Sequence, residues 1–191
     1  MVLQLSAEHQ SQIRRHGETA YPRECCGVLL GTLQQASPED AIAGTSGTVT
    51  ATAIATVMEV HAVENVWIAA SNDQFDVVDG AQETAERRFT IAPQDLLRLQ
   101  KAGRDRGFDI IGIYHSHPNY PAIPSDFDRT YAWAQYSYPI VAVHRGKAVD
   151  LRSWRLDDSG QFQPEAIHPS PPEHLQGTPS ISNGSPTDST E

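Results

Sequence analysis

Short apolar runs, many of them rich in β-branched residues, recur along the chain and are bounded by polar or glycine-containing stretches. Runs of this length and composition are typical of buried β-strands. We therefore expect strands at residues 24–31, 88–91, 110–114, 138–143 and 148–154, and one or two strands over 49–60 that continue into 62–66. The segment Arg145-Gly146-Lys147 predicts the turn between the last two strands.

Helix signals separate these strands. The expected helices cover residues 6–20, 93–106 and 125–134. Ser6 and Ser125 are suitable N-caps, while Pro93 occupies an early helical position and Gly107 follows as a C-cap. The first helix ends before Pro22 because the residue that precedes a proline is disfavoured in the helical region. The alternation of strands and helices predicts a mixed α/β (α+β) fold.

The remaining stretches are polar and suggest one domain with a tail. Residues 32–47 are rich in Ser, Ala, Gly and Gln and predict a loop, and residues 70–86 form a polar, acidic excursion. From Pro169 onward Pro, Ser, Thr and Gly dominate, a composition that cannot bury enough apolar surface to fold. We expect one domain over residues 1–168 and a disordered tail over 169–191.

Composition narrows the functional classes. The 191 residues are 39% hydrophobic and 20% charged, as in an ordinary globular protein, and the net charge of −10 argues against nucleic-acid binding. No apolar run is long enough to span a membrane, and the N-terminus lacks the layout of a signal peptide, so we expect a cytoplasmic protein. The adjacent Cys25 and Cys26 do not form a disulfide framework, which agrees with a reducing compartment.

The candidate metal-binding residues lie next to the strand predicted at residues 110–114. His115 and His117 follow at its end, and side chains two apart on a strand point to the same face. Ser125 as N-cap places Asp128 in the first helical turn, where its carboxylate can turn back toward the strand end. Two imidazoles and one carboxylate make a three-ligand set, and a catalytic zinc keeps its fourth position open. Alternatively, Ser125 and Asp128 only cap the helix and the histidines lie in a surface loop.

The spacing His-x-His-Pro-x(6)-Ser-x-x-Asp resembles the signature of the JAMM (MPN-plus, Mov34/PAD-1-like) metalloproteases, with every fixed position filled. Three further segments, residues 21–31, 88–93 and 151–156, are similar to the small bacterial, Mec-like branch of that family. The resemblance covers about residues 5–167. It implies a curved mixed β-sheet flanked by helices, similar to cytidine deaminases.

The resemblance also implies the role of each site residue. His115, His117 and Asp128 correspond to the zinc ligands, Glu24 to the general acid/base and Ser125 to the oxyanion stabiliser. A pKa near the ordinary range suffices for Glu24, because zinc does most of the acidification. The implied substrate is an amide bond after the C-terminal Gly-Gly of a ubiquitin-like, β-grasp sulfur-carrier protein.

The chain also departs from other family members. The span between Glu24 and His115 is longer than in compact members, so residues 70–86 could shape the substrate groove. No equivalent is evident of the insertions with which eukaryotic members grip ubiquitin chains. This departure favours a small carrier protein over ubiquitin chains.

Other readings stay open. A non-catalytic MPN interaction module typically loses metal ligands that this chain keeps, and a zinc amidase for small molecules would differ in its groove.

His61 and Glu64 faintly resemble a zinc deaminase, but no Pro-Cys-x-x-Cys follows. Cys25, inside an apolar run, is better explained by core packing than as a nucleophile. The histidines without ligand-like spacing are expected at the surface: His9, His16, His144, His168 and His174.

Overall fold

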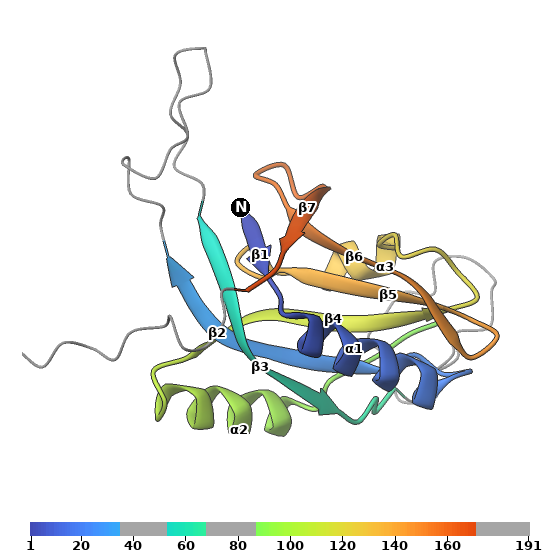
Figure 1. The fold of residues 1–191 in the computed structure, drawn as a ribbon, viewed down its shortest axis with the longest axis horizontal. Helices are drawn as coiled ribbons and strands as arrows, with labels where there is room; N and C mark the ends of the chain where they lie inside the picture. Colours follow the sequence, from blue (N-terminus) through green and yellow to red (C-terminus); the bar gives the residue numbers. More distant parts are fainter. Residues whose placement is uncertain (35–52, 68–86, 171–191) are drawn as a thin grey trace, which may run out of the picture.

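The structure is a computed structural model, and it describes residues 1–34, 53–67 and 87–170. These residues contain seven strands and three helices (Figure 1). The strands are β1 (Val2–Gln4), β2 (Cys26–Gln34), β3 (Ile54–Val63), β4 (Asp109–Pro118), β5 (Tyr138–His144), β6 (Lys147–Leu156) and β7 (Phe162–His168). The helices are α1 (Ala7–Ala20), α2 (Pro93–Arg104) and α3 (Asp126–Tyr131).

The strands form one mixed sheet in the order β1-β3-β2-β4-β5-β6-β7, which curves until it closes into a barrel. The β1–β3, β1–β7 and β4–β5 pairs are parallel and the other pairs are antiparallel. The predicted α/β fold with a curved mixed sheet is confirmed. Closure depends on β1 and β7, which we did not predict because one is three residues long and the other is polar.

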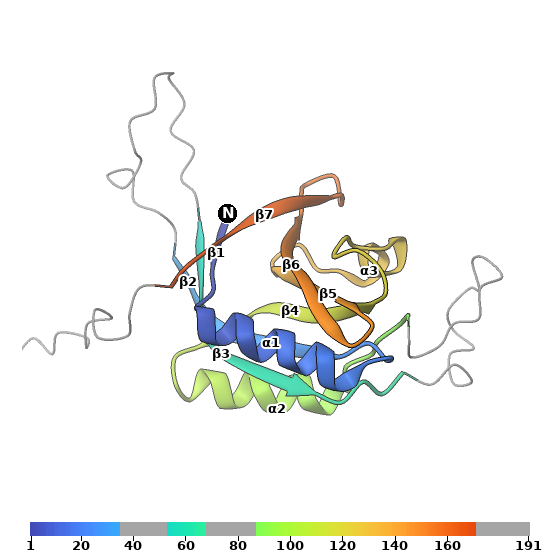
Figure 2. The same cartoon turned by 45° about the vertical axis from the view of Figure 1, so that its right-hand side comes forward.

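Helices α1 and α2 cover opposite faces of the central strand β2. Cys25 and Leu29 lie in one apolar cluster with Ile13 of α1. Val28 and Leu30 belong to a second cluster that includes Leu99 of α2. A strand buried on both faces has a continuous apolar sequence, which explains the unbroken run that predicted it. Figure 2 shows α1 and α2 running along the sheet.

The predicted helix boundaries hold at their starts and shift at two of their ends. Ser6 caps α1 by accepting a hydrogen bond from the backbone N–H of His9 at 3.1 Å. Helix α2 ends at Arg104, two residues before the predicted end. Gly107 terminates it as the predicted cap glycine: its φ is +76°, its N–H donates to the Arg104 carbonyl, and the Phe108 N–H donates to the Gly103 carbonyl, which is a Schellman arrangement. Helix α3 stops at Tyr131, three residues early.

Residues 88–91 do not form the predicted strand. Ile91 makes only an isolated bridge to Asn65. The side-chain amide of Asn65 donates to the Arg88 carbonyl at 2.9 Å and accepts from the Thr90 N–H at 3.1 Å. These bonds satisfy backbone groups that a neighbouring strand would otherwise pair. A side-chain amide therefore takes the place of a strand neighbour in this segment.

Other chain-order predictions are confirmed in part. The stretch over 49–66 forms one strand, β3, within its described residues. Arg145 and Gly146 have φ values of 50° and 79°, and this pair of left-handed residues makes the predicted turn between β5 and β6. The parts of the predicted loop, excursion and tail within residues 35–52, 68–86 and 171–191 lie outside the described residues. The domain boundary after residue 168 stays a prediction.

The histidines outside the central motif that the structure describes are exposed or half-buried. His144 and His168 are exposed, as predicted, whereas His9 and His16 are half-buried. His16 also has a specific partner, which the prediction of a surface residue did not include. Its Nδ1 lies 2.9 Å from the Tyr114 hydroxyl and its ring meets Tyr114 edge-on, because α1 packs over the buried β4. His174 lies outside the described residues. None of the helices in the described ranges has the length and apolar character that crossing a bilayer requires.

A buried carboxyl, Glu165 of β7, ties the stability of the barrel to pH. The Glu165 side chain accepts a hydrogen bond from the Ser153 hydroxyl at 2.7 Å, and burial raises its pKa. The folded state therefore binds this proton more tightly than the unfolded state does. Its contribution to stability is full below the ordinary pKa and is lost as the pH rises through the folded pKa.

Glu165→Gln removes this titration and keeps a hydrogen-bond acceptor for Ser153. We expect the variant to melt a few degrees above the native protein at pH 8, with the difference disappearing toward pH 4. Circular dichroism melts at both pH values measure this. The exposed Glu64→Gln is the control and should gain nothing. A lower melting temperature of Glu165→Gln at pH 8 would contradict the expectation.

Candidate metal centre

The carboxyl end of β4 presents two imidazoles on one face. His115 and His117 pair with Ile140 and Ala142 of the parallel strand β5, and they are only 1% and 7% exposed. The intervening Ser116 points the other way, where its hydroxyl accepts a hydrogen bond from the Cys25 N–H at 2.8 Å. The two-residue period of the strand therefore brings both rings to the same place, as predicted.

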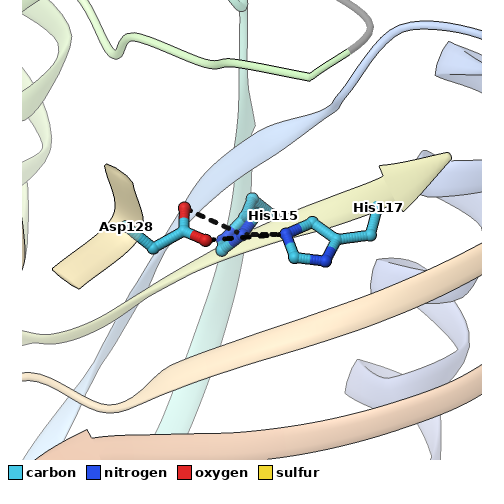
Figure 3. A group of neighbouring side chains, drawn as sticks. All are labelled: His115, His117 and Asp128. Carbon is cyan, nitrogen blue, oxygen red and sulfur yellow. Dashed lines mark hydrogen bonds and ion pairs between the residues drawn. The ribbon is translucent and has the colours of Figure 1, made fainter. Parts of the chain in front are cut away.

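Helix α3 brings Asp128 to these rings through its own cap. The Ser125 hydroxyl accepts from the Asp128 N–H at 3.2 Å, and Asp128 Oδ2 accepts from the Ser125 N–H at 2.6 Å and from its hydroxyl at 2.7 Å. This reciprocal capping box directs the carboxylate toward the strand end (Figure 3). Capping and convergence on the histidines therefore occur together, and they are not alternatives.

The spacing of the three side chains is close to that of a tetrahedral zinc site, with the two Nε2 atoms slightly nearer each other than such a site requires. The Nε2 atoms of His115 and His117 are 3.0 Å apart, and they lie 3.4 and 3.6 Å from the Asp128 carboxylate oxygens. Zinc bonds of 2.0–2.2 Å in tetrahedral geometry separate ligand atoms by roughly 3.3–3.6 Å. Among the described residues, these three form the group of potential ligands that converges in this way. They fit zinc with one position left for a further ligand.

A hydrogen bond sets the tautomer of His117, and burial and charge shift the pKa values of His115 and Asp128. His117 Nδ1 lies 2.8 Å from the Pro121 carbonyl, which can only accept, so Nδ1 carries the proton and Nε2 presents its lone pair in the neutral ring. Burial lowers the pKa of His115. Burial alone would raise the pKa of Asp128, but His115 and His117 outweigh it and hold that pKa well below its ordinary range.

The loop between the two halves of the motif is anchored to the barrel. The Trp154 indole N–H of β6 donates to the Ala122 carbonyl at 2.9 Å, one residue beyond the Pro121 carbonyl that orients His117. Ala122 is buried beside Ile140, with Trp154 packed against the same cluster. Residues 151–156 resemble the family in sequence, and this contact gives Trp154 a physical role in holding the loop.

Glu24 lies at the entrance to β2, where it is only 6% exposed. Its backbone carbonyl accepts from the Asn65 side-chain amide at 3.0 Å, the same amide that binds the Arg88 carbonyl. Burial, followed by the charge of Asp128, raises the pKa of Glu24 well above its ordinary value, although Arg88 and Arg87 oppose the rise. The sequence indicated only that an ordinary pKa would suffice for Glu24; the raised pKa follows from burial, which was not evident from position alone.

Two cavities flank the three converging side chains. A groove of about 540 Å³ includes His115 and Asp128 in its lining. Its other walls are mainly aromatic and apolar, with Trp67, Phe89, Phe127, Tyr131, Trp133 and Tyr136 among them. A polar cavity of about 170 Å³ is lined by Glu24, His117 and Ser125 together with Arg87, Arg88 and Tyr120. All five site residues predicted from the sequence therefore lie at one centre.

Sequence reasoning missed the aromatic walls and the two arginines. Phe89 stacks on His115 with ring centroids 4.7 Å apart. The Arg88 guanidinium lies over the Phe127 ring, 4.4 Å from its centroid. The segment containing Arg88 and Phe89 was noted for its family resemblance, but nothing local assigned it a role. Cys25 lies 2% exposed in the core, and burial raises the pKa of its thiol to about 12, which argues against a nucleophile.

Comparison with known proteins places these features in context. Residues 6–157 match the family described as prokaryotic homologs of the JAB domain. A desampylase from Haloferax volcanii is 30% identical over 145 residues, which cover 72% of this chain and 78% of that protein. A Desulfitobacterium hafniense protein of known solution structure shares the fold, with a TM-score of 0.64, 22% identity, and coverage of 93% of this chain and 99% of that one. A Salinibacter ruber protein gives a TM-score of 0.57, 30% identity, and coverage of 91% and 94%.

Proposed function

The chain belongs to the prokaryotic JAB-domain family, and from this premise we propose that it is a zinc-dependent metallopeptidase or isopeptidase. The proposed reaction is hydrolysis of the amide bond after the C-terminal Gly-Gly of a ubiquitin-like, β-grasp sulfur-carrier protein. The observation that carries the proposal is the convergence of His115, His117 and Asp128 beside the buried Glu24. A non-catalytic module has no need of a complete ligand set or of a buried carboxyl next to it.

His115, His117 and Asp128 would hold the zinc. When bound, zinc supplies Lewis acidity and lowers the pKa of a water molecule. Glu24 takes a proton from the attacking water as the new C–O bond forms, and returns it to the leaving nitrogen as the C–N bond breaks. Its raised pKa suits a group that must both accept and donate a proton near neutral pH.

Ser125 lies at the rim of the polar cavity, and we propose that its hydroxyl donates to the carbonyl oxygen of the scissile amide as charge develops there. The hydroxyl donates to Asp128 Oδ2 at 2.7 Å in the structure. Donation to substrate therefore requires a rotation about the Cβ–Oγ bond. The backbone N–H of Ser125 bonds the same carboxylate oxygen and keeps Asp128 in place meanwhile.

A protein substrate is favoured by the relative and by the groove. The Haloferax volcanii protein is a desampylase by name, which indicates a ubiquitin-like SAMP substrate for that enzyme. In this chain the apolar groove is bordered by Leu97, Tyr131 and Trp133, which are 68%, 45% and 57% exposed. An exposed aromatic border suits a protein surface or an extended tail better than a closed small-molecule pocket does. We also propose that the protein acts in the cytoplasm.

The test is incubation of the zinc-loaded protein with a panel of β-grasp carrier proteins that have C-terminal extensions after Gly-Gly. Intact mass should show release of the extension, loss of activity on chelation and recovery when zinc is restored. Absence of cleavage across the panel by folded, zinc-loaded protein would contradict the proposed substrate. Cleavage of small acylated amines instead would identify a zinc amidase.

A further inference from the structure

The side-chain amide of Asn65 makes four hydrogen bonds to the backbone. Its Nδ2 donates to the Glu24 carbonyl at 3.0 Å and to the Arg88 carbonyl at 2.9 Å. Its Oδ1 accepts from the Trp67 N–H at 3.0 Å and from the Thr90 N–H at 3.1 Å. An asparagine amide has two N–H donors and two oxygen lone pairs, so all of them are used. Because carbonyls only accept and backbone N–H groups only donate, these partners fix the orientation of the amide.

The segments that this amide joins also contact the metal centre. Phe89 lies between the two bonded residues of its segment and stacks on His115, with ring centroids 4.7 Å apart. Trp67 meets the ring of Phe127 edge-on, with centroids 5.6 Å apart, and Phe127 is the residue before Asp128. One side chain therefore connects the carboxyl assigned to proton transfer with a ring on a proposed ligand and with the helix that carries another.

Glu24 lies just outside the sheet, and side chains help to hold the backbone there. β2 begins at Cys26, two residues further on. The Cys25 N–H donates to the Ser116 hydroxyl at 2.8 Å, and the Glu24 carbonyl accepts from Asn65. Because a peptide unit is planar, a bond to this carbonyl fixes the ψ angle of Glu24. The direction of the Glu24 side chain relative to β2 therefore depends on the Asn65 amide.

We propose that Asn65 is a positioning residue for hydrolysis, which holds the Glu24 carboxyl where it can reach the attacking water and the leaving nitrogen. Asn65 lines neither cavity, so it acts through Glu24. A general acid/base must come within hydrogen-bond reach of the proton it transfers, and a displacement of about 1 Å can cost about 10²-fold in rate. The inference rests on the proposed function, because that function gives Glu24 its role.

A purely structural role of Asn65 makes a different prediction. If the amide only stabilises the fold, its replacement lowers the melting temperature or the zinc affinity, and it reduces turnover by the same factor with or without the Glu24 carboxyl. If Asn65 acts through Glu24, its replacement has no further effect once Glu24 has become glutamine. A double-mutant cycle of Asn65→Asp and Glu24→Gln separates these roles.

Asn65→Asp keeps the shape and the oxygen acceptors of the side chain and removes both N–H donors. We expect kcat of the zinc-loaded protein for a carrier protein extended after Gly-Gly to fall about 10–100-fold, while KM and zinc affinity stay close to native values. In the Glu24→Gln background the same change should alter kcat by less than about twofold. Asn65→Ala removes all four bonds without adding a charge, and it should lower kcat at least as much.

Gln10→Ala is the matched control, because the Gln10 amide also donates to a backbone carbonyl, that of Leu5, and lines neither cavity. It should keep native kcat. Circular dichroism melts and zinc content accompany every sample. Loss of zinc from the Asn65 variants would assign the amide a structural role and overturn the inference.

Crystal structures of the zinc-loaded native protein and of Asn65→Asp provide a readout that does not need turnover. The Glu24 carboxyl should move by about 1 Å or more relative to His115 and His117, while β2 and β4 stay in place. An unmoved carboxyl, native kcat in both Asn65 variants, or an equal loss of kcat with and without the Glu24 carboxyl would each overturn the inference and leave the hydrolase intact. Absence of cleavage by the native protein, together with a displaced carboxyl in the variant, would overturn the proposed reaction alone.

Discussion

Glu24→Gln is expected to lower kcat for carrier cleavage by about 10²–10⁴-fold, while the protein stays folded and keeps its zinc. Glutamine matches glutamate in size and fills the same buried position, but it cannot take a proton from water or return one to the leaving nitrogen. The Glu24 backbone carbonyl that Asn65 binds is unaffected by the change of side chain. The effect should therefore fall on kcat and leave the affinity for zinc unchanged.

Single-turnover kinetics with intact-mass detection measure this effect, and zinc content and a circular dichroism melt accompany each sample. Glu64→Gln is the matched control, because Glu64 is an exposed carboxyl just beyond β3 that lines neither cavity. It should keep native activity. If Glu24→Gln retained more than a tenth of native kcat, another group would have to carry the proton, and the role assigned to Glu24 would be wrong.

Asp128→Asn is expected to weaken zinc binding by more than 100-fold, with loss of activity at ordinary zinc concentrations. Replacement of groups that only orient a ligand already costs about 10–100-fold in metal affinity, and a direct ligand should cost more. Asparagine can still accept the Ser125 N–H bond that Asp128 Oδ2 accepts at 2.6 Å, so the cap of α3 is kept. The lost charge also leaves two buried imidazoles without an anionic neighbour.

Zinc affinity is measured by competition with a chromophoric chelator, and zinc per chain by elemental analysis. Asp126→Asn is the matched control: its side chain is 94% exposed, lies in the same helical turn and pairs with Arg129. This control should bind zinc as the native protein does. About one zinc per chain with native affinity in Asp128→Asn would show that the metal lies elsewhere or that His115 and His117 suffice to bind it.

The convergence of His115, His117 and Asp128 could be predicted because the rules that place these side chains are local. His115 and His117 share a face through the two-residue period of β4, and Ser125 and Asp128 meet through the capping geometry of one helical turn. Only a short loop separates these two pieces. The apolar run of β2 was similarly informative, because burial on both faces demands a continuous apolar sequence.

The neighbourhood of Glu24 depends on contacts between distant segments, which no local rule determines. Antiparallel pairing of β2 with β4 places Cys26 opposite His115 and so brings Glu24 to the metal centre. The Asn65 side chain then attaches the segment that carries Arg87 and Arg88. The raised pKa of Glu24 follows from the burial that this assembly creates.

By itself, then, the sequence determined the family, the convergence of His115, His117 and Asp128, and most strands and helices, since period, caps and spacing act over a few residues. Only the tertiary structure decided the closure of the barrel through β1 and β7, whose short or polar sequences carry little strand signal. It also decided which side of the centre is aromatic and which is positively charged. The physical reason is that the burial of a side chain and the charge around it depend on neighbours from separate segments of the chain. The order of residues along the chain does not show which segments become neighbours.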